Sequence, residues 1–178
     1  MPIYFRQLVD FASTVSFIHE VSGGRFKFGI GVSHAPALKQ RGLDGGKPLS
    51  DTREFVAQLK EVPRAGELPP IVLATLRTKM IALAEEIAGG MVFANGARSH
   101  MAQSLSVISE STRSSDFFIG DMIPTCINDD IEAAKAINRR TLTSYAMLPN
   151  YRNYWKEAGY IDEMNGIEKA LEAGDREK

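Results

Sequence analysis

The sequence predicts an α/β fold built on a parallel sheet with helices outside it. Strand-like and helix-like segments alternate from Phe26 to Leu148, and two of the strands are continuous apolar runs, residues 71–74 and 91–94. Strands without polar alternation are buried on both faces, which is typical of parallel sheets covered by helices. At 178 residues, with 44% apolar and 24% charged content, the chain has the composition of one globular domain, so we expect a single domain over residues 1–178.

The first elements are a helix, a strand and a long loop. Between Phe5 and Glu20 apolar residues recur at spacings of three and four, the pattern of a helix packed on one side. This stripe consists of Leu8, Val9, Ala12, Val15 and Ile18. Ser22-Gly23-Gly24 end the helix, and alternation over residues 26–32 predicts a short strand whose glycines mark close approach of backbone or ligand. Residues 33–49, rich in Gly and Pro without a period, predict a loop.

The middle of the chain repeats the strand-helix unit. Asp51 and Glu54 have the spacing of a capping box, which predicts a helix that ends before Pro63. The apolar run 71–74 predicts a strand, and a helix over residues 80–87 follows it. The run 91–94 predicts the next strand, and the helix after it covers residues 101–108.

The last third begins with an extended segment over residues 117–127. Asp129 and Glu132 are expected to cap a helix that ends before Pro149. Tyr154 and Trp155 follow Tyr151 at spacings of three and four, which is typical of core side chains on a helix, although the three rings can also close over a partner or substrate. From Ile161 onward the pattern predicts a helix with a charged tail.

Composition excludes several classes of function. A net charge of −1 with interspersed signs gives no basic stripe for nucleic acid or an anionic membrane surface. No run of 18 apolar residues occurs and the first twenty residues are too polar for a signal peptide, so we expect a cytoplasmic protein. One cysteine and three widely spaced histidines provide neither a disulfide nor a recognisable metal motif. No Ser-His-Asp pattern or Walker-type phosphate loop is present.

Several motifs together resemble one known family. Ser22–Phe26 followed by Phe28–His34 resembles the SGGR-F…LG-x-G signature of luciferase-like monooxygenases, especially their deazaflavin-dependent branch. Pro69–Ala74 is similar to the family's PP-I-x-x-A segment, and residues 129–134 with Leu148–Tyr151 resemble its last strand, helix and LP-x-Y segment. These matches cover nearly the whole chain.

The resemblance implies a fold, an activity and a missing part. Family members are (β/α)8 TIM-type barrels, and Met1 would fall at the end of the fourth strand, so the chain would supply roughly the second half of a barrel, with parallel strands and outer helices. The implied function is a flavin- or deazaflavin-dependent oxidoreductase or monooxygenase that acts on a small-molecule substrate with reduced FMN or the 8-hydroxy-5-deazaflavin coenzyme. Such a half would be incomplete alone, so the expected partner is a second copy, as a homo-oligomer, or the missing N-terminal half. The alternative is a non-catalytic half-barrel that binds flavin weakly or serves as an assembly partner.

The cofactor would bind at the carboxyl ends of the strands. The turn after the strand 71–74 opens a helix and places two hydroxyls and two cations in five residues, which favours a cofactor phosphate. An ordinary polar helix start with solvated cations explains the same pattern equally well. The residues of this predicted phosphate turn are Thr75, Leu76, Arg77, Thr78 and Lys79.

Three further residues follow predicted strands. Ser33 and His34 lie where a barrel places catalytic or ring-contacting groups, and His34 can polarise a carbonyl or be an ordinary loop histidine. Asn95 can contact the pyrimidine edge of the cofactor, although Asn-Gly is also a favourable turn dipeptide. Arg25 can neutralise a phosphate or, as we favour, fix the turn before its strand.

Overall fold

The computed structural model describes residues 1–174, and its contacts divide the chain into two compact units. The first unit consists of Met1–Ala94 with Ser106–Asp121, and the second of Asn95–Leu105 with the chain from Met122 onward. The single domain over residues 1–178 therefore stays a prediction. The predicted charged tail falls on residues 175–178, which lie outside the described part of the chain.

Four parallel strands form the sheet, which confirms the predicted α/β class. Their order in the sheet is the order along the chain, β1-β2-β3-β4. Ile30 pairs with Leu73, and Leu73 pairs with Met91, so the strands are aligned without large offsets. Successive parallel strands need a crossover between them, and helices provide it here. The strands are β1 (Phe28–Ile30), β2 (Ile71–Thr75), β3 (Gly90–Ala94) and β4 (Phe118–Met122).

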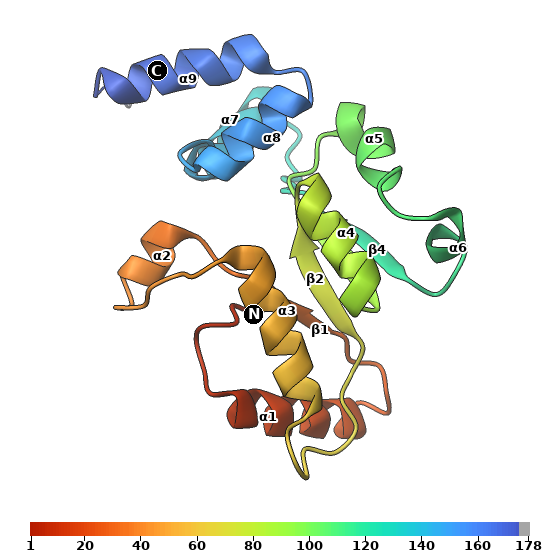
Figure 1. Cartoon of the computed structure of the whole chain (residues 1–178). Helices are drawn as coiled ribbons and strands as arrows, with labels where there is room; N and C mark the ends of the chain where they lie inside the picture. The colour runs from red at the N-terminus through yellow and green to blue at the C-terminus, as the bar shows by residue number, and fades with distance from the viewer. Residues whose placement is uncertain (175–178) are drawn as a thin grey trace. The chain divides into compact units, whose positions relative to one another are not determined.

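Helices cover one face of this sheet in the first unit (Figure 1). The long ones are α1 (Leu8–Val21), α3 (Pro48–Lys60) and α4 (Thr78–Ile87), and α3 contacts both of the others. The ring centre of Phe11 in α1 lies 5.7 Å from that of Phe28 and 5.4 Å from that of Phe55. One aromatic side chain therefore joins α1 to both β1 and α3. Two short helices, α2 (Ala35–Lys39) and α6 (Glu110–Arg113), complete the unit.

The other face of the strands, which we call the inner face, carries small side chains. Gly29 and Ala74 are exposed on it, and a Cβ at Gly31 would lie only 2.9 Å from the Ala74 Cβ. Lys27 directly precedes β1 in the sequence, and its Nζ lies 5.7 Å from the ring centre of Phe118 on β4. Two strands lie between β1 and β4 in the sheet. The side chains of Lys27 and Phe118 therefore approach each other across the two central strands.

The second unit is helical (Figure 1). Its helix α8 (Pro149–Glu157) contacts both α7 (Ile131–Ala146) and α9 (Ile161–Glu172). Tyr151, Tyr154 and Trp155 on α8 are 5%, 1% and 9% exposed, which confirms that they form a core. Glu168 of α9 accepts hydrogen bonds from Lys156 and Arg152 of α8, at 2.6 and 3.2 Å. The unit contains a 3-10 turn (Arg98–His100), α5 (Met101–Leu105), α7 (Ile131–Ala146), α8 (Pro149–Glu157) and α9 (Ile161–Glu172).

Both predicted capping boxes are wrong in detail. α3 begins at Pro48, three residues before Asp51, because a proline fits the first helical turn, where its missing N–H is not needed. Asp51 instead accepts a 2.7 Å hydrogen bond from the Tyr4 hydroxyl. At α7 the cap is Asp130 rather than Asp129, and its Oδ1 accepts from the backbone N–H groups of Glu132 and Ala133.

Three predicted segments also differ from the structure. The predicted loop 33–49 contains α2, which has Pro36 in its first turn. The predicted helix 101–108 ends at Leu105, and Ile108 reaches its buried position from irregular backbone. Val9 is 61% exposed, because the buried stripe of α1 runs through Phe11, Ala12 and Val15. Within residues 1–174, no helix combines the length and apolar character needed to cross a membrane.

Candidate functional site

The predicted phosphate turn has the geometry that the sequence indicates. β2 ends at Thr75, Arg77 occupies the extended N-cap position, and α4 begins at Thr78 without a side-chain cap. The first N–H groups of a helix have no partner inside the helix and carry the positive end of its dipole. Thr78 and Lys79 are exposed, so the hydroxyl and the ammonium group are accessible beside this helix start.

Thr75 differs from its neighbours in being buried. Its side chain is 4% exposed, and its Oγ1 has no hydrogen-bond partner in the described structure. Leu76 beside it is half-buried. Buried polar groups are nearly always hydrogen-bonded, so the Thr75 hydroxyl is free to bond to a group that the described structure does not contain.

Ser33 and His34 follow the neighbouring strand β1. Ser33 has a left-handed backbone with φ of 65°, which turns the chain sharply at this point. His34 is the N-cap of α2, and its backbone oxygen accepts hydrogen bonds from Ala37 and Leu38 at 2.9 and 3.1 Å. Burial lowers the pKa of the His34 imidazole, so its neutral form predominates at pH 7. Because β1 and β2 are paired and parallel, Ser33, His34 and the phosphate turn lie at the same edge of the sheet.

Asn95 belongs to the second unit and directly follows β3 in the chain. Its φ of 58° is left-handed, a conformation that asparagine tolerates, and its N–H donates to the Met122 oxygen at 3.0 Å. The side chain is 7% exposed, and neither Oδ1 nor Nδ2 has a partner among the described residues. The turn interpretation therefore accounts for the backbone of Asn95 but leaves its amide unexplained.

A hollow of about 310 Å³ lies over the inner face of the strands in the first unit. Its floor is made of glycine, alanine and valine, and the predicted residue Ser33 lines it. Gly31 has to be glycine there, because a Cβ would collide with Ala74. The small side chains keep space open above the sheet. The lining residues are Met1, Pro2, Gly29, Ile30, Gly31, Ser33, Val72, Ala74 and Val92.

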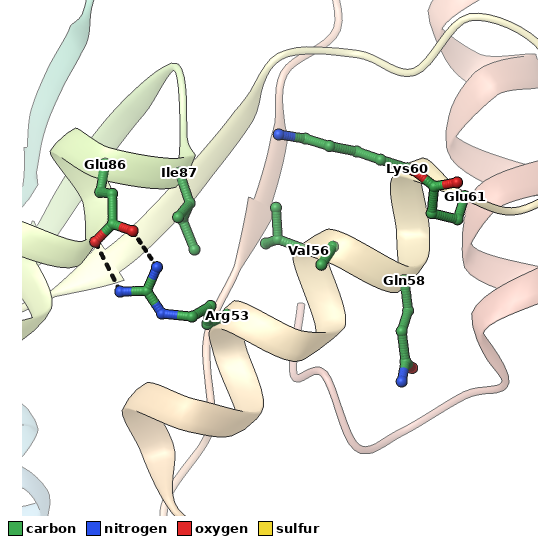
Figure 2. A pocket seen from close by; sticks show the side chains of 8 residues that line it. Arg53, Val56, Gln58, Lys60, Glu61, Glu86 and Ile87 are labelled. Carbon is green, nitrogen blue, oxygen red and sulfur yellow. Dashed lines mark hydrogen bonds and ion pairs between the residues drawn. The ribbon is translucent and has the colours of Figure 1, made fainter.

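A second hollow lies on the outside, between α3 and α4, and contains none of the predicted site residues (Figure 2). The Arg53 guanidinium there binds both carboxylate oxygens of Glu86, and this hydrogen bonding lowers the pKa of Glu86. Val56 and Ile87 form its apolar part. The charges of Arg53 and Glu86 neutralise each other, and the other polar residues that line the hollow are Gln58, Lys60 and Glu61.

Two contacts show side chains in structural roles. The Arg25 Nε donates to the Ser22 oxygen at 2.7 Å, which confirms that Arg25 fixes the turn before its strand. Sequence reasoning missed the Tyr154 hydroxyl, which accepts a 2.9 Å hydrogen bond from the N–H of Ala97, two residues after Asn95. No local signal predicts a contact between residues 57 positions apart. Among residues 1–174, no three His, Cys, Asp or Glu side chains gather closely enough to hold a metal ion.

Comparisons with known proteins agree with this geometry. A model of the luciferase-like monooxygenase family matches residues 1–178. Among solved structures, the coenzyme F420-dependent tetrahydromethanopterin reductase from Methanopyrus kandleri superposes with a TM-score of 0.72 at 16% sequence identity. The match covers 99% of this chain and 63% of the reductase chain, so the fold described here is part of a luciferase-like TIM barrel. No curated protein matches the sequence.

Proposed function

Because the chain belongs to the luciferase-like monooxygenase family, we propose that it forms part of a flavin- or deazaflavin-dependent oxidoreductase acting on a small-molecule substrate. The observation that carries the proposal is the buried, unpaired hydroxyl group of Thr75, located where β2 of the parallel sheet ends. Barrels of this type bind their ligands at the carboxyl ends of the strands.

The proposed phosphate site consists of the start of α4 and the side chains of its first turn. The uncapped N–H groups and the Thr78 hydroxyl would donate hydrogen bonds to phosphate oxygens, and Lys79 would supply positive charge. Thr75 Oγ1 would gain in the complex the partner that it lacks here. Both reduced FMN and the 8-hydroxy-5-deazaflavin coenzyme carry phosphate, so this site fits either cofactor.

Asn95 would recognise the ring. Its amide offers one acceptor and one donor from a buried position, which is complementary to a cyclic N–H beside a carbonyl, the arrangement on the pyrimidine edge of flavins and deazaflavins. Without a ligand, both amide groups are left unpaired and buried, which is unfavourable.

His34 would act as a neutral hydrogen-bonding group. Burial lowers its pKa, so at pH 7 the imidazole can donate a hydrogen bond to a carbonyl or accept a proton, but it adds no positive charge. Ser33 beside it lines the hollow over the inner face, where the small side chains leave room for a substrate.

The bound cofactor supplies the redox chemistry, which is hydride transfer or oxygen activation. The role of this chain is to bind the phosphate, orient the ring and exclude water from it.

We propose that a complete pocket requires a further part. The chain spans 63% of the reductase that it resembles, and Pro2 forms a parallel bridge to Gly31 beside β1, as the end of a preceding strand would. We infer that the chain corresponds to the second half of the barrel, with β1 to β4 as its fifth to eighth strands. The rest of the wall would come from an N-terminal half or from a second copy.

Cofactor titration tests the proposal. Reduced FMN and the 8-hydroxy-5-deazaflavin coenzyme are titrated into the purified chain, with binding followed by quenching of cofactor fluorescence or by calorimetry, and molar mass by light scattering. We expect a micromolar Kd, equal to about −8 kcal/mol, for one of the two. Lys79→Gln should weaken binding by about threefold to tenfold through loss of one charged phosphate contact.

Lys60→Gln is the matched control, because Lys60 is an exposed lysine at the end of α3, in the outer hollow. The two substitutions make the same chemical change at different places. Absence of binding to any soluble species at about 100 μM cofactor, which is weaker than roughly −5 kcal/mol, would contradict cofactor binding by this chain. That result would favour a non-catalytic assembly partner.

A further inference from the structure

The turn that carries Asn95 is fixed at two points within the second unit. The Asn95 N–H donates to the Met122 oxygen at 3.0 Å, and the Ala97 N–H donates to the Tyr154 hydroxyl at 2.9 Å. Asn95 itself has a left-handed backbone, so its side-chain direction depends on how the turn is held. The first bond is a backbone contact that any sequence can make, whereas the second needs a hydroxyl group.

Tyr154 is itself rigidly held. It is 1% exposed on α8, and the His100 ring packs against it edge-to-face, with ring centres 5.5 Å apart. A buried aromatic ring in a close-packed core has one position, so its hydroxyl is a fixed acceptor. Phenylalanine would fill the same volume; the hydroxyl is what holds Ala97.

We propose that Tyr154 is a positioning residue that aims the Asn95 amide at the cofactor by anchoring the Ala97 N–H. The inference rests on the proposed function of Asn95 and adds to it Tyr154, which lies 57 positions after Ala97 in the sequence. The amide of Asn95 is buried and unpaired, and it has to be held in one orientation. A donor and an acceptor recognise the hydrogen-bonding pattern of a ligand only when their directions are fixed.

The test begins with Tyr154→Phe, which removes the hydroxyl and keeps the ring. We expect the Ala97 amide proton to exchange with solvent about tenfold faster, because one hydrogen bond is lost. In cofactor titration, Kd should rise by about threefold to tenfold. Tyr145→Phe is the matched control, because Tyr145 is an α7 tyrosine whose ring packs edge-to-face on Tyr151 at 4.8 Å. We expect it to leave both readouts unchanged.

A double-mutant cycle separates positioning from general support. If Tyr154 acts through Asn95, Tyr154→Phe should have no further effect on Kd in an Asn95→Ala background. A purely structural role would raise Kd by the same factor in both backgrounds.

The outcomes distinguish the two proposals. If Tyr154→Phe raises Kd by the same factor in both backgrounds, or leaves the Ala97 exchange rate unchanged, only the proposed role of Tyr154 is overturned. Cofactor binding that is absent, or unaffected by Asn95→Ala, would overturn the proposed function of Asn95 and this inference with it.

Discussion

Two buried threonines in the first unit each have a hydroxyl group without a hydrogen-bond partner, but they lie in different surroundings. Thr75 and Thr52 are 4% and 2% exposed, and neither hydroxyl has a hydrogen-bond partner in the described structure. Thr75 ends β2 at the edge where we propose that the cofactor binds, whereas Thr52 lies inside α3. If only Thr75 serves a ligand, the two residues should respond alike in stability and differently in binding.

Valine substitution separates these effects. Thr75→Val and Thr52→Val should each raise the free energy of unfolding by about 1 kcal/mol, because an unpaired buried hydroxyl is replaced by a methyl group of similar size. Only Thr75→Val should weaken cofactor binding. Urea denaturation and cofactor titration of both variants provide the measurements, and a stability loss of about 1 kcal/mol or more in Thr75→Val would show that its hydroxyl is already satisfied.

At the residue scale, the sequence predicts positions better than partners. The location of Thr75 between a strand and a helix depends only on neighbouring residues; the sequence predicts this junction, although Thr75 is the last residue of β2 rather than the first residue after it. The bond between Tyr154 and Ala97 depends on how distant segments pack, and spacing along the chain carries no such information. The binding roles of Ser33, His34 and Asn95 stay predictions.

At the element scale, Gly29 in β1 and Gly31 directly after it form a matched pair of glycines. A Cβ at Gly31 would lie 2.9 Å from the Ala74 Cβ, whereas a Cβ at Gly29 would meet nothing within 4 Å. Gly31→Ala should therefore lower the free energy of unfolding by about 1–3 kcal/mol through overpacking. Gly29→Ala should leave it unchanged or raise it by up to about 1 kcal/mol. Thermal unfolding of both variants measures this difference. Equal Tm values would contradict it and would mean that β1 and β2 separate easily at this point.

The contact between α4 and α6 predicts a pH dependence. Glu85 of α4 accepts hydrogen bonds from the Thr112 and Ser109 hydroxyls, both 2.7 Å, and from the Ser109 N–H at 2.8 Å, and these bonds lower its pKa below the ordinary 4.5. Because the folded-state pKa is the lower one, the stabilisation is present above pH 4.5 and is lost as pH falls through the folded-state pKa.

Glu85→Gln should therefore be less stable than the wild type at pH 7, and the difference should shrink as pH falls below 4.5. Urea denaturation at pH 7, at pH 4.5 and at the lowest pH at which the chain folds measures this difference. Glu61→Gln, at the exposed glutamate directly after α3, is the control. A difference that does not change with pH would show that the carboxylate charge is unimportant there.

The elements themselves are largely predictable, and their ends are not. The apolar runs predict β2 and β3 to within one residue. The N-cap of α3 is missed by four residues and that of α7 by one, because more than one residue near each start is chemically able to begin a helix.

At the scale of the whole molecule, the open inner face predicts self-association. Ala74 is exposed in β2, where the residues before it are apolar. The strands β1 and β4 are the outermost of the four hydrogen-bonded strands. Natural proteins cover such a sheet face and its edges. We therefore expect light scattering of the purified chain to give at least the mass of two copies. Ala74→Glu should reduce the mass, whereas Ala57→Glu, at an exposed alanine on α3, should leave it unchanged. A wild-type chain that stays monomeric would contradict this prediction.

The fold of the whole could be predicted only by resemblance. Periodicity indicates a parallel α/β sheet, and many architectures share that pattern. The motifs at residues 22–34, 69–74 and 148–151 are what indicate a barrel, and the family match and the superposed reductase agree with it.

The position of the only tryptophan gives the two units separate optical signals. Trp155 is 9% exposed in the second unit, with its ring centre 5.6 Å from that of Tyr151, and the first unit contains no tryptophan. Excitation near 295 nm therefore reports the melting of the second unit alone, whereas far-ultraviolet circular dichroism records helices of both. For the single domain that the sequence predicts, the two melting curves should coincide. A fluorescence transition several degrees below the dichroism transition would instead mean that the first unit holds its sheet together without the helices that follow it.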